Sequence, residues 1–211
     1  MNVNFEYSKT LAIEGSILLL LSLIPYVGWV LGIVGVVLLL RSMKEFSNYY
    51  QDEKIYLDSL TGVKYYIVAI IAAAVASAAF IVGIWSATGF TESFVLTAGF
   101  GIGLAAFIAG LVVAFVFYIL ASSHLKRTFN TLAEKSGEGS LATAGTLLWI
   151  GSILTIIGVG LILIFISWIF ATIGFSAMKS RQYQQYTPQN GYGYAAQPTQ
   201  PEQPKSTAAQ P

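Results

Sequence analysis

The feature that most constrains this chain is an uncharged, mostly apolar stretch in its C-terminal half. Leu141–Met178 spans 38 residues without an Asp, Glu, Lys or Arg. A straight α-helix of that length would measure about 57 Å, whereas the hydrocarbon core of a bilayer is about 30 Å thick. Helix tilt cannot absorb such an excess. The stretch therefore predicts two membrane segments, with the turn at Gly158 and Gly160.

A second long apolar stretch, residues 11–40, has the same design. It carries a single charged residue, Glu14, and is interrupted by Pro25. Proline lacks a backbone donor and disfavours helix in the residue before it. We therefore expect the chain to turn back at Pro25, with Gly28 directly after the turn.

The composition agrees with an integral membrane protein. Hydrophobic residues make up 55% of the 211 residues and charged residues 10%, whereas soluble domains carry about 25% charged residues. Two further apolar blocks, 65–86 and 94–121, lie between the two long stretches. The net charge of +1 provides no basic field for nucleic acid, and the absence of cysteine excludes disulfides and thiolate metal sites. The first apolar run exceeds signal-peptide length and has no Ala-x-Ala cleavage site, so we expect it to be retained.

The distribution of lysine and arginine supports a turn in both long stretches. Basic residues concentrate in loops on the cytoplasmic side of a membrane. If each long stretch crossed once, the connections 41–64 and 122–140, with seven basic residues, would lie opposite the termini. If both stretches turn back, all eleven basic residues lie on one side. We therefore predict a multi-pass protein of the cell membrane with cytoplasmic N- and C-termini.

The predicted fold is an all-α membrane bundle of about six segments, in which two Gly/Pro-turned hairpins flank two longer helices. The membrane domain is expected to cover residues 1–179, with segments at about 8–24, 28–48, 62–86, 94–135, 140–157 and 160–179. The first and fifth segments are near the lower length limit for spanning. The alternative is therefore a four-block bundle in which both hairpins are re-entrant, and the charge rule does not separate the two cases.

The two hairpins share a sequence pattern. LAIEGSIL at residues 11–18 and LLWIGSIL at 147–154 have Leu, Gly, Ser, Ile and Leu in register, and each hairpin ends in a Met-Lys dipeptide, at Met43 and Met178. An internal duplication explains the pattern, and a chance match between apolar sequences is the alternative. Repeats with paired, interrupted helices are a feature of many transporters.

Three stretches of the chain resemble an uncharacterised, mainly archaeal family of membrane proteins. They are GSILLLLSLIPYVGWVLGIVGVVLLLRSMKEFSNYY, LAEKSG and TAGTLLWIGSILTIIGVGLILIFISWIFATIGFSAMK. The family is catalogued as a domain of unknown function, number nine-nine-six, and the resemblance covers roughly residues 6–179. Because the family has no established activity, the resemblance implies a membrane protein of archaeal source and no catalytic residues.

Two polar residues are candidates for a functional site. Glu14 is an acidic residue inside an apolar run, and such residues often form proton or cation sites. The alternative is an interfacial role, because Lys9 is close by in sequence and the repeat places Ile150 where Glu14 stands. His124 is the sole histidine. Without cysteines or clustered carboxylates around it, a structural role at the interface is expected in preference to a metal or serine-nucleophile site.

Small residues at four-residue spacing predict faces for close helix packing, because lipid provides no hydrophobic drive for helix association. Such faces favour a tight bundle or a homo-oligomer. The residues concerned are Gly28, Gly32, Ala69, Ala73, Ser77, Gly99 and Gly103.

The composition changes abruptly at residue 180. Residues 180–211 are rich in Pro, Gln and Tyr and nearly free of aliphatic side chains, which predicts a disordered cytoplasmic tail. Pro198, Pro201 and Pro204 at three-residue spacing favour polyproline II, a conformation that protein partners recognise. The alternative is a solubilising tail without a partner.

The most direct functional interpretation is a non-enzymatic membrane scaffold or interaction protein with membrane lipid as its surroundings. The alternative is a small-solute or ion transporter or channel that uses the paired, broken helices, although its interior would offer few polar groups beyond serine and threonine. An intramembrane enzyme would need a coherent set of reactive residues, and the sequence has none. No cofactor, metal or nucleic-acid partner is expected.

Overall fold

The computed structural model describes residues 4–24, 26–88 and 93–180, with the side chains of 86–99 left out. Within these ranges every regular element is helical, which confirms the predicted all-α fold. The tail and Pro25 lie outside the described residues. The elements are α1 (Phe5–Leu21), α2 (Gly28–Tyr50), α3 (Glu53–Thr88), α4 (Ser93–Ser136), α5 (Gly139–Leu154), the 3₁₀ helix η1 (Thr155–Ile157) and α6 (Gly160–Ala177).

Four described stretches are long and apolar enough to cross a membrane, which agrees with the predicted class of membrane protein. They are Glu53–Trp85, Phe100–Ser136, Gly139–Ile157 and Gly160–Ala177. By contrast, α1 has only 17 residues, and the second half of α2 carries Arg41, Lys44 and Glu45. The α1–α2 hairpin therefore differs from the other helices in how much apolar length it offers a bilayer.

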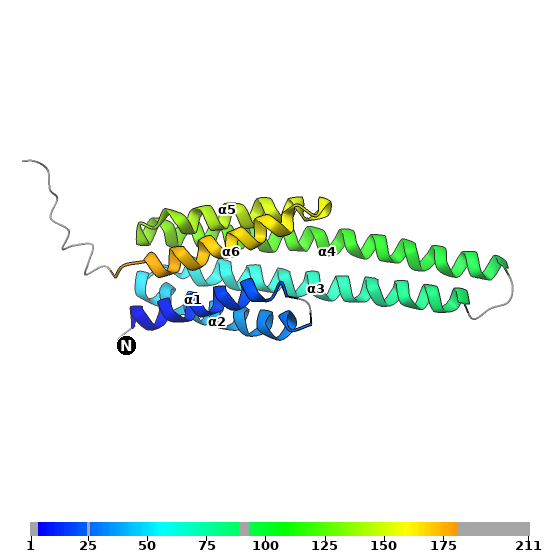
Figure 1. Cartoon of the computed structure of the whole chain (residues 1–211), viewed down its shortest axis with the longest axis horizontal. Coiled ribbons are helices and arrows are strands. Elements are labelled where there is room, and N and C mark those ends of the chain that lie inside the picture. The colour runs from blue at the N-terminus through cyan, green and yellow to red at the C-terminus, as the bar shows by residue number, and fades with distance from the viewer. Residues whose placement is uncertain (1–3, 25, 89–92, 181–211) are drawn as a thin grey trace, which may run out of the picture. The chain divides into compact units, whose positions relative to one another are not determined.

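The helices form three antiparallel hairpins, α1–α2, α3–α4 and α5–α6, which lie side by side (Figure 1). Consecutive helices contact one another, and α1 also contacts α6, so the six helices form a closed ring. The α3–α4 hairpin is much longer than the other two and continues well past their apices (Figure 1). We call the opposite end, where α1, α3 and α5 begin, the charged end, because the charged residues of the described helices gather there.

The turn between α2 and α3 is shorter than the sequence suggested. The third helix was expected from about residue 62, but α3 begins at Glu53. Gln51 adopts a left-handed conformation with φ 53° and ends α2. The Asp52 carboxylate accepts a hydrogen bond from the Lys54 backbone N–H at 3.1 Å, as an N-terminal capping residue does. Two residues therefore reverse the chain, and α3 runs without interruption into its apolar half.

An aromatic core fills the charged end of the ring. Phe46 from α2 lies 5.9 Å from Phe5 of α1 and 6.4 Å from Phe175 of α6, measured between ring centroids. Phe129 from α4 lies 5.8 Å from Phe175 in an edge-to-face arrangement. Phe46, Phe129 and Phe175 are almost completely buried. Four helices are therefore held together at this end by ordinary hydrophobic packing.

Beyond this core, α3 and α4 contact each other through small residues. A Cβ atom added to Gly110 would lie 2.5 Å from the Cβ of Ala76, and one added to Gly103 would lie 2.8 Å from the Cα of Gly83. The outward faces of both helices expose isoleucine and valine along this part of the hairpin. The backbones therefore approach as closely as glycine and alanine permit, as is typical of membrane helices.

The glycine of the repeated Gly-Ser pair has the same environment in both short hairpins. A Cβ on Gly15 would lie 3.1 Å from the Gly35 carbonyl oxygen of α2, and one on Gly151 would lie 3.0 Å from the Gly160 carbonyl oxygen of α6. In each case the glycine allows the two arms of one hairpin to approach closely. The duplicated sequence therefore corresponds to a duplicated packing arrangement.

A second pair of contacts fixes the alignment of the two copies. The Ser42 hydroxyl donates to the Ser8 carbonyl oxygen at 2.8 Å, and the Ser167 hydroxyl donates to the Ala144 carbonyl oxygen at 2.7 Å. Ser42 and Ser167 are thus equivalent. Their successors, Met43 and Trp168, are equivalent as well, so the two Met-Lys dipeptides do not correspond in the structure.

The apex of the α5–α6 hairpin lies at the glycines predicted to form it. Gly158 has φ 81°, a left-handed conformation that side chains disfavour, and it ends η1. Gly160 begins α6 with its Cα against the backbone of Gly151 and Thr155, which leaves no room for a side chain. In the first hairpin Gly28 begins α2 and lies against the backbone of Ser22.

The small-residue contact predicts different effects of the same substitution at two neighbouring glycines. Gly103→Ala places a methyl group against Gly83 and should lower the free energy of unfolding by about 1–3 kcal/mol through overpacking. Gly101 has no heavy atom within 4 Å of an added Cβ, so Gly101→Ala should leave stability unchanged or raise it by about 0.5–1 kcal/mol. Thermal unfolding in detergent, followed by circular dichroism, measures both. Equal effects of the two substitutions would contradict the close contact.

Candidate functional site

Side-chain hydroxyl groups join the helices at several levels of the bundle. Each of these hydrogen bonds connects two neighbouring helices and is short enough to be well formed. They link Ser42 to the Ser8 carbonyl (2.8 Å), Ser16 to Thr172 (2.9 Å), Ser59 to Thr128 (3.1 Å), Ser122 to Ser152 (2.6 Å) and Ser167 to the Ala144 carbonyl (2.7 Å). Because each of these bonds joins two specific positions, together they fix how the helices are aligned along one another.

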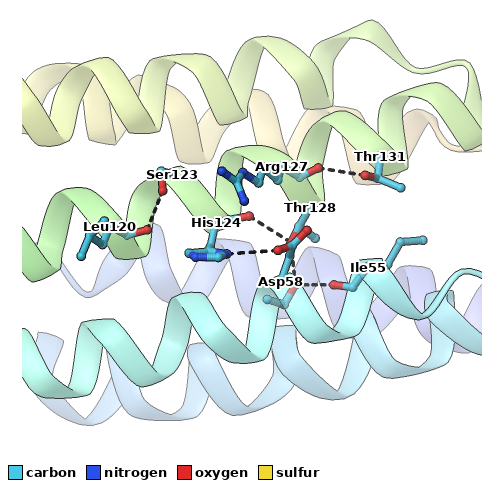
Figure 2. A network of polar contacts seen from close by, with 9 residues as sticks. Ile55, Asp58, Leu120, Ser123, His124, Arg127, Thr128 and Thr131 are labelled. Carbon is cyan, nitrogen blue, oxygen red and sulfur yellow. Dashed lines mark hydrogen bonds and ion pairs between the residues drawn. The ribbon is translucent and has the colours of Figure 1, made fainter.

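The most developed polar cluster lies between α3 and α4, near the charged end (Figure 2). His124 Nδ1 donates to the Asp58 carboxylate at 3.0 Å. The side chains are 19% and 25% exposed, so both are largely removed from solvent. The ring of Tyr65 packs against the imidazole, with centroids 5.5 Å apart.

A hydroxyl pair lies directly beside this hydrogen bond. Ser59 donates to Thr128 Oγ1, and it also contacts the Ile55 carbonyl one helical turn earlier at 2.8 Å. Thr128 in turn donates to the His124 carbonyl at 3.3 Å. Figure 2 shows Asp58, His124 and Thr128 on the facing sides of the two helices. The cluster therefore connects α3 to α4 through two adjacent turns.

The arrangement around His124 favours a structural role over catalysis. A serine nucleophile would have to donate to the imidazole. However, Ser123 donates to the Leu120 carbonyl at 2.8 Å, and Ser122 bonds with the Ile119 carbonyl and with Ser152. Within the described residues no group of three or more His, Cys, Asp or Glu side chains could hold a metal ion. What the cluster can do chemically is to fix α3 against α4.

Asp58 was not singled out by the sequence, although it is the partner that orients His124. The two residues are 66 positions apart, and only the antiparallel register of α3 and α4 brings them together. In the structure, Ala76–Gly110 and Gly83–Gly103 share one antiparallel register, and Gly62 lies against Ala121 and His124 at the other end of the contact. This register places Asp58 level with Thr128, one helical turn from His124, and the two side chains meet across that turn.

Glu14 lies on the exposed face of α1. It makes no side-chain hydrogen bond or ion pair within the described residues, in contrast to Lys9, whose ammonium group donates to the Met178 carbonyl at 3.0 Å. Glu14 therefore points away from the hydroxyl bonds that line the interior of the ring. The structure does not bring Glu14 together with His124 or with any other predicted site residue.

The predicted small-residue faces are used unequally. Gly28 and Gly103 form close contacts within the chain, and a Cβ on Gly32 would lie 3.3 Å from the Cβ of Ser22. On α3, Ala69 is buried, Ala73 is partly buried and Ser77 is exposed, so this face turns away from α4. Gly99 is one of the residues whose surroundings the structure does not describe.

The Asp58–His124 pair predicts an energetic coupling across α3 and α4. Asp58→Ala and His124→Ala should each lower the free energy of unfolding by about 1 kcal/mol, and the double variant should lose little more than either single one. Denaturant titration in mixed micelles measures the three variants, with Leu57→Ala, an exposed neighbour, as the control. Strictly additive losses would show that the pair contributes no interaction energy.

Comparison with known proteins identifies the group to which this bundle belongs. No solved structure matches the chain. A protein of Methanocaldococcus jannaschii, named uncharacterised protein MJ1644, is 25% identical over 166 residues, which cover 78% of this chain and 89% of that protein. Residues 31–169 match a family described as protein of unknown function (DUF996). This match extends from α2 to α6 and covers more than half of the sequence, so the chain belongs to the DUF996 family.

Proposed function

We propose that this protein is a non-enzymatic membrane scaffold or interaction protein. The observation that supports the proposal is the use of the interior hydroxyl groups. Ser16, Ser122 and Ser152 are buried and each bonds to a hydroxyl of a neighbouring helix. Groups that hold helices together in this way are not available to hydrate or coordinate a solute. A bundle of this construction is suited to keeping one fixed shape in the membrane.

A transport role finds less support from the arrangement of the residues. Substrate and ion sites of transporters lie inside the bundle, at broken helices whose polar groups face one another. Glu14, the residue that suggested a cation site, is on the outer face of α1. The turn at Gly158–Gly160 lies at a hairpin apex surrounded by exposed isoleucines, not at the centre of the ring.

The scaffold proposal includes partners and an orientation. The positive-inside rule favours the charged end, and with it both termini, on the cytoplasmic side of the cell membrane. There the Pro/Gln/Tyr-rich tail would be accessible to a protein partner. A homo-oligomer through small-residue faces would use residues outside the α3–α4 contact, such as Gly101 and Ala105, which are exposed on α4.

A scaffold should hold one conformation whatever gradient is applied across the membrane. The chain has no cysteine, so spin labels can be placed at Val30→Cys on α2 and Ile162→Cys on α6, both exposed. Double electron–electron resonance in proteoliposomes should give one narrow distance distribution that does not change with ion or pH gradients. A second distance that grows when a gradient is applied would favour alternating access and a transporter.

The orientation can be measured separately with a thiol reagent that does not cross membranes. A single cysteine at the exposed position Leu57, near the charged end, should remain unlabelled in intact cells. It should become labelled once the cytoplasmic side is opened, because the basic residues around it favour that side. Labelling in intact cells would reverse the proposed orientation without affecting the scaffold role.

A further inference from the structure

The hydrogen bond between Ser122 and Ser152 fixes the position of the α5–α6 hairpin along α4. The length of helix beyond this bond therefore gives the reach of each element. Beyond Ser152 only five residues remain before η1 ends at Ile157, which corresponds to about 10 Å. Beyond Ser122, α4 continues back to Ser93, which corresponds to about 44 Å. The apex of α5–α6 therefore ends roughly 30 Å short of the far end of α4, as the course of the helices shows (Figure 1).

The α1–α2 hairpin is short for the same reason. α2 and α3 start from one turn at Gln51–Asp52 and run side by side. α2 has 23 residues and α3 has 36, so their lengths are about 35 Å and about 54 Å. The apex of α1–α2 therefore stops about 20 Å before α3 ends. Both short hairpins leave the far part of α3–α4 without a neighbour in the chain.

The residues of α3 indicate where a bilayer fits. Lys64 is the last charged residue on this helix, and Tyr65 and Tyr66 follow it directly. An exposed tryptophan, Trp85, lies near the far end. No charged residue lies between Tyr66 and Trp85. The 19 residues from Tyr66 to Trp85 correspond to about 29 Å, which matches the hydrocarbon core of about 30 Å.

With the bilayer in this position, both short apices lie inside it. Counting from the shared turn, Gly28 lies level with about residue 75 of α3, near the bilayer midplane. The apex of α5–α6 lies level with a slightly shallower part of α3. By length and composition alone, α5 and α6 could cross the bilayer. However, the Ser122–Ser152 hydrogen bond to α4 holds the apex of α5–α6 in the half of the bilayer nearer the charged end.

The exposed side chains at both apices suit lipid and not water. Tyr26 and Trp29 at the first apex are 98% and 79% exposed, and Ile156 at the second is 75% exposed. Val27 and Ile157 beside them are exposed as well. No charged residue lies within either apex. Apolar groups this exposed are stabilised when acyl chains cover them.

We propose that the two short hairpins insert into one leaflet only, so that six helices occupy the leaflet at the charged end and two occupy the other. The ligand of this surface is the acyl region of the near leaflet. Because the protein takes up more area in that leaflet, it stabilises a bilayer that is convex toward the charged end. The inference rests on helix lengths and not on the scaffold role, so either can fail without the other.

The depth of the apices tests the first half of the proposal. Single spin labels are placed at Val27→Cys and Ile156→Cys, with Val75→Cys, Ile81→Cys and Leu57→Cys as depth references on α3, in vesicles of phosphatidylcholine. Accessibility to oxygen and to a water-soluble nickel chelate should place both apex labels no deeper than the label at residue 75. Apex labels beyond the label at residue 81, with chelate access from the far side, would establish full crossings and overturn the proposal.

Sorting between vesicles of different size tests the second half. Protein reconstituted into small and large phosphatidylcholine vesicles with its charged end outward should be enriched per lipid area in the small ones. The double variant Val27→Lys/Ile156→Lys should lose this enrichment, because charged apices are excluded from the core. Leu57→Lys, exposed at the charged end, is the matched control and should keep it. Helicity by circular dichroism verifies folding, and equal densities of the unaltered protein in both vesicle sizes would overturn the curvature preference.

Discussion

The architecture depends on how helices attract one another where there is no water to expel. In lipid, association rests on close van der Waals contact and on hydrogen bonds between helices. The chain supplies the first with glycines such as Gly15, Gly103 and Gly151, and the second with buried serines such as Ser122. At the charged end the burial of Phe46 and its aromatic neighbours adds ordinary hydrophobic packing. The bundle thus combines a soluble-type core at one end with membrane-type contacts at the other.

Much of this fold could be predicted because membrane helices have strong sequence signals. Charge-free length predicted the bounds of five of the six helices within a few residues, and Gly158 predicted the second turn. The start of α3 was not predicted, since a left-handed Gln51 has no clear signature. The close contact of α3 with α4 runs through other small residues than the predicted Ala69, Ala73 and Ser77. Residues placed every four positions from Ala69 onward shift by about 40° around the helix axis at each step, so they do not stay on one face. Ala76 and Gly83, which contact α4, are seven residues apart and lie on the same face of α3.

The candidate site was harder to predict because it depends on contacts between distant residues. His124 was noted as a lone histidine, but its partner Asp58 belongs to another helix, and nothing local marks it. The repeat shows a related limit. Its Gly-Ser pair identified equivalent packing positions in both hairpins, whereas the matching Met-Lys dipeptides stand at positions that do not correspond. Sequence similarity between apolar helices therefore requires structural contacts to decide which residues are equivalent.

The closure of the ring has a consequence for biosynthesis. Ser16 of α1 reaches its partner Thr172 across 156 positions, so this contact cannot form until the ribosome has delivered α6. During that time the face of α1 that carries Ser16 has no helix beside it. The hydroxyl also contacts the Ile13 carbonyl of its own helix at 2.9 Å, which keeps it satisfied in lipid. The first helix can therefore enter the membrane early, and the last helix completes the assembly without displacing a bound partner.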